Sequence, residues 1–329
     1  MRLSTWKMEL RTLILLLVCN LIWSANPVLS KFLLRDFSAP DAAWLRYGSA
    51  FGSYLVFIMF RGRFAHAFAM PAKVKDWLLI AVLGFFAFCV SPLANMGGLQ
   101  VSRAMDGALI TAMEPMLAIL LAWMLLRERV GSHQLIALGF ALLGFSLLAD
   151  ITLSRILSLD LSGHTVGNLI LLISITGEAV YSVLGKKLMI RHEPMPVFGS
   201  ALGIGMLLLT LSNAFFAGAA LPQFSSFTWS SFFAVLWLGP LGTMVSYLYW
   251  MTALKRAPVA AVVITLFVQP VFGSLLGALL LGERLSAVQA FGALLILTAV
   301  FGRSLVALFR GRAERTGGEE STVPDVAAQ

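Results

Sequence analysis

The sequence predicts an all-α polytopic membrane protein of ten transmembrane helices, arranged as two inverted five-helix repeats. Three observations support this fold class. The 329-residue chain is 59% hydrophobic and only 12% charged, with a mean hydropathy of +0.88, whereas soluble domains carry about 25% charged residues. Its apolar runs reach the length of about 20 residues that a bilayer-spanning helix needs. Finally, polar dipeptides recur at one fixed offset in the two halves of the chain.

The apolar runs between charged or turn-rich breaks give the predicted helices in chain order. They cover residues 12–34, 40–60, 77–99, 105–126, 132–150, 166–188, 195–216, 230–253, 259–281 and 286–308. The first run is not interpreted as a cleaved signal peptide, because it is too long and lacks a small-residue cleavage site. The polar tail 309–329 contains glycine and proline and is predicted to be disordered.

Basic residues predict the orientation. If the helices alternate in direction, about 18 of the 24 Lys and Arg residues fall on the side of the N-terminus. This asymmetry predicts a multi-pass protein of the cytoplasmic (inner) membrane with both termini in the cytoplasm. The net charge of +8 is spread over short loops and does not follow one face, so we expect no nucleic-acid partner.

The two halves share a repeat with an offset of 155 residues. Glu114-Pro115 matches Gln269-Pro270, and Glu128-Arg129 matches Glu283-Arg284. Ser91 matches Ser246 at the same offset. Because each unit would hold five spans, an odd number, the second copy enters the membrane from the opposite side. The predicted units are 12–150 and 166–308, and two such halves can rock around a site between them.

The chain resembles the EamA-type branch of the drug/metabolite transporter superfamily. The resemblance rests on MEPMLAILLAWMLLRERVGSHQLIALGFALLGF and its counterpart FVQPVFGSLLGALLLGERLSAVQAFGALLIL, together with the early NLIWSANPVLSKFLL. It covers roughly residues 12–308 in two copies. The resemblance implies a ten-helix fold of two inverted repeats that moves metabolites such as amino acids out of cells. Substrates vary among members, so the resemblance does not identify the substrate of this chain.

Glu114 and Pro115 are the first candidate functional residues. An ionised carboxylate in mid-span is costly and normally faces a cavity or a partner, and Pro115 removes a helical hydrogen bond. The carboxylate could hold a substrate ammonium or carry a proton. Alternatively, a protonated Glu114 could hydrogen-bond to a neighbouring helix and hold the kink. The equivalent pair is Gln269 and Pro270, and Gln269 cannot ionise.

The remaining candidates lie in spans three, six and eight. Glu178 is a second intramembrane carboxylate, with Tyr181 one turn along the same face; pairing with a neighbouring span is the alternative. Spans three and eight contribute polar and aromatic groups that could form a constriction or stack on a substrate cation, although ordinary packing also explains them. They are Ser91, Asn95, Ser246, Tyr247 and Trp250. Pro92 and Pro240 are expected to bend these spans.

Other charged residues receive structural interpretations. Arg46 is expected to form an ion pair with Asp41, and Lys31 and Lys186 are expected to extend towards the membrane interface. The Glu-Arg pairs after spans four and nine are expected to pair locally and fix the following turn. Cys19 and Cys89 lie in apolar runs and are interpreted as reduced and inert.

Several chemistries have no sequence signal. The four histidines show no ligand spacing with Cys or Asp, so we expect no metal and no cofactor. A phosphate-binding loop and a nucleophile elbow are absent from the sequence. We therefore expect a secondary transporter that exports amino acids or similar small metabolites, not an enzyme, with protons as the candidate coupling ion. A passive facilitator or channel and, less favoured, a membrane-embedded enzyme remain the alternatives.

Overall fold

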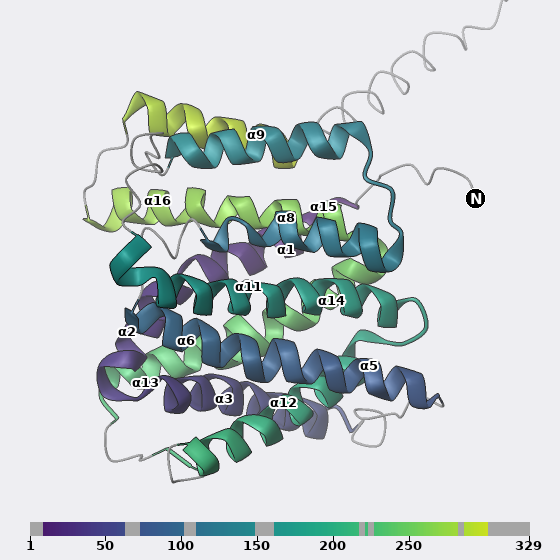
Figure 1. Cartoon of the computed structure of the whole chain (residues 1–329), viewed down its shortest axis with the longest axis vertical. Coiled ribbons are helices and arrows are strands. Elements are labelled where there is room, and N and C mark those ends of the chain that lie inside the picture. The colour runs from purple at the N-terminus through teal and green to yellow at the C-terminus, as the bar shows by residue number, and fades with distance from the viewer. Residues whose placement is uncertain are drawn as a thin grey trace, which may run out of the picture.

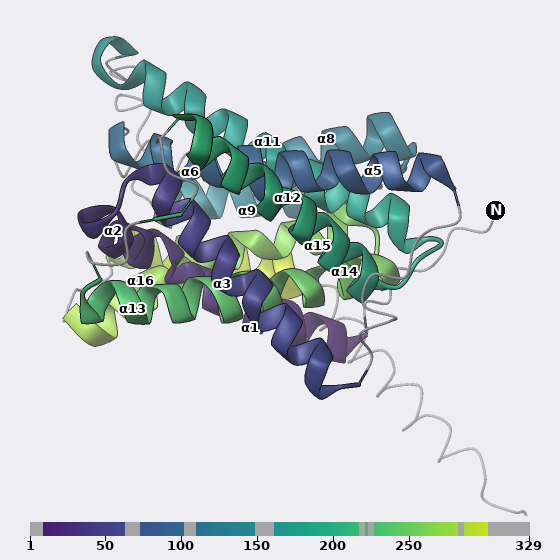
Figure 2. The same cartoon turned by 90° about the horizontal axis from the view of Figure 1, so that it is seen from below.

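The computed structural model describes residues 9–62, 73–101, 110–148, 161–216, 221–222, 227–281 and 286–301. Within these ranges the chain is helical, without a strand. Most of the helices lie side by side with their axes roughly aligned (Figure 1, Figure 2). The predicted disordered tail and the Glu283-Arg284 pair lie outside the described residues.

The first half of the chain forms helices at the predicted positions. In order they are α1 (Leu10–Ser24), α2 (Asn26–Asp36), α3 (Ala39–Phe60), α5 (Val74–Phe85), the π-helical η1 (Phe86–Val90), α6 (Ser91–Val101), α8 (Glu114–Leu121), the π-helical η2 (Ala122–Leu126) and α9 (Ser132–Leu148). The predicted span at 12–34 is divided at Ala25, which separates α1 from α2.

The second half of the chain is also helical. It contains α11 (Leu161–Met189), α12 (Pro194–Phe216), α13 (Trp229–Leu236), the π-helical η4 (Trp237–Val245), α14 (Ser246–Arg256), α15 (Val259–Val263), the 3₁₀-helical η5 (Ile264–Phe267), α16 (Val268–Leu281) and a last apolar helix at Ala287–Phe301. In the described part of the chain, five helices are long and apolar enough to cross a membrane, and shorter apolar helices accompany them.

Both Pro-centred segments are interrupted at the position that the sequence indicates. α8 begins at Glu114, with Pro115 in its first turn, after a turn at residues 112–113. In the second half, α15 gives way to η5 before α16 begins at Val268, next to Gln269 and Pro270. Proline cannot donate the helical hydrogen bond, and a membrane protein tolerates such a break where protein or water surrounds it.

The helices that contain Pro92 and Pro240 are also irregular. The π-helical η1 ends directly before Ser91, and η4 contains Pro240 and ends directly before Ser246. Such wide turns re-satisfy backbone groups around a proline and are common at functional sites. Because Ser91 and Ser246 occupy matching places in the two halves, the same irregularity precedes the same residue twice.

Close backbone packing brings α11 against η1 and α6. A Cβ atom added at Gly177 would lie 2.6 Å from the carbonyl oxygen of Phe86 and 2.6 Å from Cβ of Ser91. Only a glycine permits this approach, which places the next residue, Glu178, beside Ser91. Elsewhere, α9 and the last helix approach each other through Gly144 and Gly292, and they lie together at one edge of the molecule (Figure 1).

Two charged residues contact helix ends in other parts of the chain. Lys186 Nζ donates to the carbonyl oxygens of Leu254 (2.7 Å) and Ala257 (2.9 Å), at the end of α14. The Glu128 carboxylate does not pair locally. Its Oε2 accepts from the backbone N–H of Val259 at 3.1 Å, at the start of α15. Free backbone groups at helix ends attract charged side chains from distant segments, and neither contact is visible in local sequence.

We predict that Gly177→Ala destabilises the protein by about 1–3 kcal/mol, because the added methyl group overpacks a contact between two backbones. Thermal unfolding of the purified protein in detergent would measure this effect. Gly97→Ala is the matched control, since nothing lies within 4 Å of a Cβ atom at that position. Equal unfolding temperatures for the two variants would contradict the prediction.

Candidate functional site

The centre of the candidate site is the carboxylate of Glu178 in the middle of α11. Its Oε1 accepts hydrogen bonds from Ser91 Oγ at 2.9 Å and from Tyr247 Oη at 2.9 Å, and Oε2 lies 2.8 Å from the same Tyr247 hydroxyl. Ser91 Oγ also lies 3.4 Å from Ser174 Oγ. The structure therefore brings together three predicted site residues from α6, α11 and α14.

Aromatic rings surround this carboxylate. The Tyr247 ring packs against Tyr181, Trp23 and Phe88, with centroid distances of 4.9, 5.4 and 5.7 Å. Tyr181 also donates its hydroxyl to the backbone oxygen of Tyr247 at 2.8 Å. Tyr181 and Tyr247 are buried, whereas Trp23 and Glu178 stay partly accessible. The aromatic cluster fixes the Tyr247 hydroxyl and so orients the Glu178 carboxylate.

Arg46 belongs to this region, and its predicted ion pair with Asp41 is not formed. Arg46 is buried in α3 and donates from Nε to Thr243 Oγ1 at 3.2 Å, with its guanidinium 5.2 Å from the centroid of the Tyr47 ring. Its charge is within electrostatic reach of Glu178. Asp41 instead accepts hydrogen bonds from Ser38 and Asn213. Five residues along a helix do not share a face, which explains the failure of the expected pair.

Glu114 lies at the start of α8 and close enough to Glu178 for the two charges to interact. Its side chain is partly accessible. Among the residues that the structure describes, no hydrogen bond or ion pair reaches its carboxyl group. This is the main difference between the two acidic residues: Glu178 is held by hydroxyl groups, whereas Glu114 is not.

Gln269 is tied into the opposite half of the chain. Its Nε2 donates to Oδ1 of Asn20 in α1 at 3.0 Å, and Asn20 Nδ2 donates to Thr265 Oγ1 at 3.1 Å and to the backbone oxygen of Leu16 at 2.8 Å. Asn20 is fully buried. Gln269 is thus held by hydrogen bonds at the place that matches Glu114, next to Pro270.

The other predicted residues have mainly structural contacts. Trp250 donates its indole N–H to Ser182 Oγ at 3.1 Å, and Ser246 donates its hydroxyl to the Leu241 carbonyl oxygen at 2.8 Å. Pro115 is buried within the first turn of α8. Asn95 lies one turn beyond Ser91 in α6 and is partly accessible.

Sequence reasoning did not select Asn20, Arg46 or Trp23 as site residues. The sequence nevertheless contains a feature that distinguishes each of the three residues. Asn20 is a polar residue inside the first apolar run, Arg46 is a cation inside the second, and Trp23 matches Glu178 at the repeat offset. Trp23 packs on Trp250 at 5.2 Å and donates its indole N–H to the Gly242 carbonyl oxygen, so it and Glu178 both contact α14.

The arrangement combines groups that can bind a charged solute. One oriented carboxylate, one less restrained carboxyl group, a buried guanidinium and aromatic faces lie together inside an apolar helix bundle. Such groups can bind a small charged solute and exchange a proton, since intramembrane ionisable residues typically mark substrate and ion pathways.

Comparisons with known proteins agree with this description. The model of the EamA-like transporter family matches residues 10–149 and again residues 165–305. The chain is 23% identical over 298 residues to the uncharacterized transporter YyaM of Bacillus subtilis, covering 90% of this chain and 94% of that protein. An uncharacterized transporter of Archaeoglobus fulgidus is 23% identical, with 85% of this chain and 93% of that protein covered.

A solved crystal structure shares the fold. Its TM-score is 0.70 at 18% sequence identity, and the superposition covers 90% of this chain and 97% of the other. The family model covers most of the chain in two successive matches, and the relatives align over nearly their whole lengths. This chain, a multi-pass membrane protein, therefore belongs to the EamA-like transporter family.

Proposed function

We propose that this protein is a secondary transporter that exports amino acids or similar small metabolites across the cytoplasmic membrane by alternating access. In this proposal ten helices form two inverted five-helix units, 12–150 and 166–308, with both termini in the cytoplasm. The observation that carries it is the Glu178 carboxylate, held by Ser91 and Tyr247 within α11 and beside the two interrupted helices. Interrupted helices around a midplane site are typical of secondary transporters.

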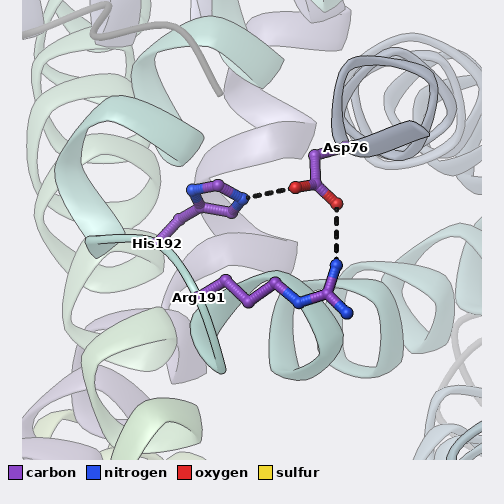
Figure 3. Close-up of polar contacts among 3 residues, drawn as sticks. All are labelled: Asp76, Arg191 and His192. Atoms are coloured by element: carbon purple, nitrogen blue, oxygen red, sulfur yellow. Dashed lines mark hydrogen bonds and ion pairs between the residues drawn. The ribbon is translucent and has the colours of Figure 1, made fainter. Parts of the chain in front are cut away.

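A group of polar side chains joins the two halves at the end of the molecule where the N-terminus lies. Asp76, buried in the first turn of α5, lies 2.9 Å from His192 Nε2 and 3.6 Å from Arg191 Nη1 at the end of α11 (Figure 3). We call this group the α5–α11 tie. Glu193, the next residue, accepts from Lys255 at 2.6 Å. A buried carboxylate with an arginine and a histidine partner resists separation of these helix ends.

A second contact joins the halves at the opposite end, where α2 and α13 lie together (Figure 1). Thr228 Oγ1 donates to Asp36 Oδ2 at 2.6 Å, and we call this pair the α2–α13 tie. Asp36 matches Arg191 at the repeat offset, and Ser231, which hydrogen-bonds Thr228, matches Asp76. The two ties thus use equivalent positions at opposite ends, which supports an inverted repeat with one closure for each side of the membrane.

The charges of the site support an amino-acid-like substrate. Glu178 can bind an ammonium group, and the partly accessible Trp23 offers an aromatic face for the same cation. Arg46, within electrostatic reach of Glu178, supplies the complementary positive charge for a carboxylate. One negative and one positive group close together match a zwitterion. The outward direction of transport rests on the family resemblance.

Transport by purified protein in liposomes tests the proposal directly. A panel of radiolabelled amino acids and related metabolites would be offered with and without an imposed proton gradient. We expect saturable accumulation of a zwitterionic solute that collapses when an uncoupler is added. Saturable equilibration without accumulation would favour a facilitator, and conductance in planar bilayers would favour a channel; either result would contradict a coupled carrier.

We predict that Tyr247→Phe raises the KM for the transported solute by about tenfold or more, because a hydrogen bond to a charged group contributes about 1.5–3 kcal/mol. Initial uptake rates in liposomes would measure it. Tyr249→Phe is the control: Tyr249 lies in the same helix and is exposed, and it has no contact with Glu178. A normal KM for Tyr247→Phe would show that the oriented carboxylate does not bind substrate.

We predict that Glu114→Gln abolishes accumulation driven by a proton gradient but preserves exchange of labelled for unlabelled solute. An amide cannot release a proton, whereas Glu178 still binds the substrate. Accumulation and exchange would be measured in the same liposome preparation, with Glu9→Gln as a control at an exposed carboxylate of the N-terminal side. Unchanged accumulation and an unchanged pH profile would exclude coupling through Glu114.

We predict that the two ties control access from opposite sides. A single reporter cysteine at Asn95, with Cys19 and Cys89 replaced by Ala, would be labelled with a membrane-impermeant maleimide in vesicles of both orientations. Asp76→Asn should increase labelling from the side of the N-terminus, because it removes the charge that Arg191 and His192 share. Asp36→Asn should increase labelling from the other side. An increase from the same side in both variants would contradict alternating access.

A further inference from the structure

A large apolar groove lies on the outer surface of the helix bundle, separate from the Glu178 region. Its volume is about 940 Å³, and α8, η2, α9 and α11 contribute to its lining. The lining is hydrocarbon apart from Arg129 and Thr176, and it includes Met113, Met116, Leu120 and Trp123. Leu120 is 49% exposed and Trp123 59% exposed. Neither Glu114 nor Glu178 lines this groove.

Two arginines stand at one end of the groove. A second, smaller hollow of about 520 Å³ adjoins it and is lined by Trp123, Met124, Arg127 and Arg129. Both arginines are exposed, and in the part of the chain that the structure describes neither has an ion-pair partner. Trp123 and Arg129 line both hollows. The groove therefore changes from hydrocarbon to positive charge at the end of the membrane segment.

Glu128, the residue between the arginines, does not neutralise them. Its carboxylate faces the protein, where Oε2 accepts from the Val259 N–H at 3.1 Å. Arg127 adopts a left-handed backbone conformation, with φ of 55°, directly after η2. This turn ends the helix and lets Glu128 reach α15. The loop thus presents both guanidinium groups outward while its only carboxylate is committed to another helix.

We propose that this groove binds an anionic phospholipid, with an acyl chain along the Met113–Trp123 face and the phosphate headgroup on Arg127 and Arg129. The guanidinium fork binds phosphate oxygens in pairs, and basic pockets next to membrane helices bind anionic headgroups. The indole of Trp123 lies between chain and headgroup, a position that Trp favours at membrane interfaces. Two exposed guanidinium groups beside an apolar groove match a molecule with an anionic headgroup and an acyl chain, which is the chemistry of an anionic phospholipid.

Native mass spectrometry of the full chain, released from mixed micelles, tests the headgroup contact. Phosphatidylglycerol and phosphatidylcholine with the same acyl chains would be titrated separately. We expect phosphatidylglycerol to bind the wild-type protein more tightly. The double variant Arg127→Gln/Arg129→Gln should lose roughly 30-fold in affinity for phosphatidylglycerol, as expected for two basic residues at an anionic surface. The control Arg61→Gln/Lys75→Gln removes the same charge from exposed positions outside the groove.

A second pair of variants tests the acyl chain. Leu120→Trp places bulk inside the groove and should reduce phosphatidylglycerol binding, whereas Leu135→Trp, exposed on α9 but not part of the lining, should leave binding unchanged. Equal affinity for the two lipids, or an equal loss in the two double variants, would overturn the proposal. A lipid-free dimer that Leu120→Trp dissociates would also overturn it, because the groove would then be an interface between copies. None of these measurements depends on transport activity.

Discussion

The carboxyl group of Glu178 is the constraint around which the centre of this protein is built. A carboxylate in the middle of a membrane helix is unfavourable unless other groups solvate it. Ser91 and Tyr247 donate to it from α6 and α14, and Arg46 stands within electrostatic reach from α3. Holding these groups in place requires the glycine contact at Gly177 and the aromatic packing around Tyr247. One carboxyl group inside the helix bundle thus makes contacts that link several helices.

The second constraint is the need of every backbone group for a partner inside a membrane. The 3₁₀-helical η5 and the π-helical turns η1 and η4 would be unfavourable against lipid. They pack instead against other helices: η1 against α11 and α12, η4 against α3, and η5 against α1 and α9. Charged side chains also provide hydrogen-bond partners for backbone groups at helix ends. Glu128 accepts from the backbone N–H of Val259 at the start of α15, and Lys186 donates to carbonyl oxygens at the end of α14. Contacts of this kind satisfy backbone groups that have no hydrogen-bond partner within their own helix.

Besides the central contacts, polar groups also join the halves at the two ends of the molecule. The α5–α11 tie and the α2–α13 tie are small compared with the packed centre. Contacts of a few hydrogen bonds can open at low free energy, whereas the apolar packing near Gly177 cannot yield without lost volume and lost dispersion contacts. The centre is thus tightly packed, whereas the contacts at the two ends rest on a few polar groups.

The sequence by itself determined the membrane class, the helix positions and the interruption at Pro115, because hydrocarbon content, run length and proline geometry are local properties. It also selected Glu178, Ser91 and Tyr247, as polar groups in apolar runs. Only the tertiary structure decided their partners. Arg46 donates a hydrogen bond to Thr243 and does not pair with Asp41. Asn20 accepts a hydrogen bond from Gln269, and Glu128 accepts one from the first residue of α15. A buried polar group takes whichever partner packing brings within about 3 Å, and residues far apart in the chain become neighbours only when the helices pack.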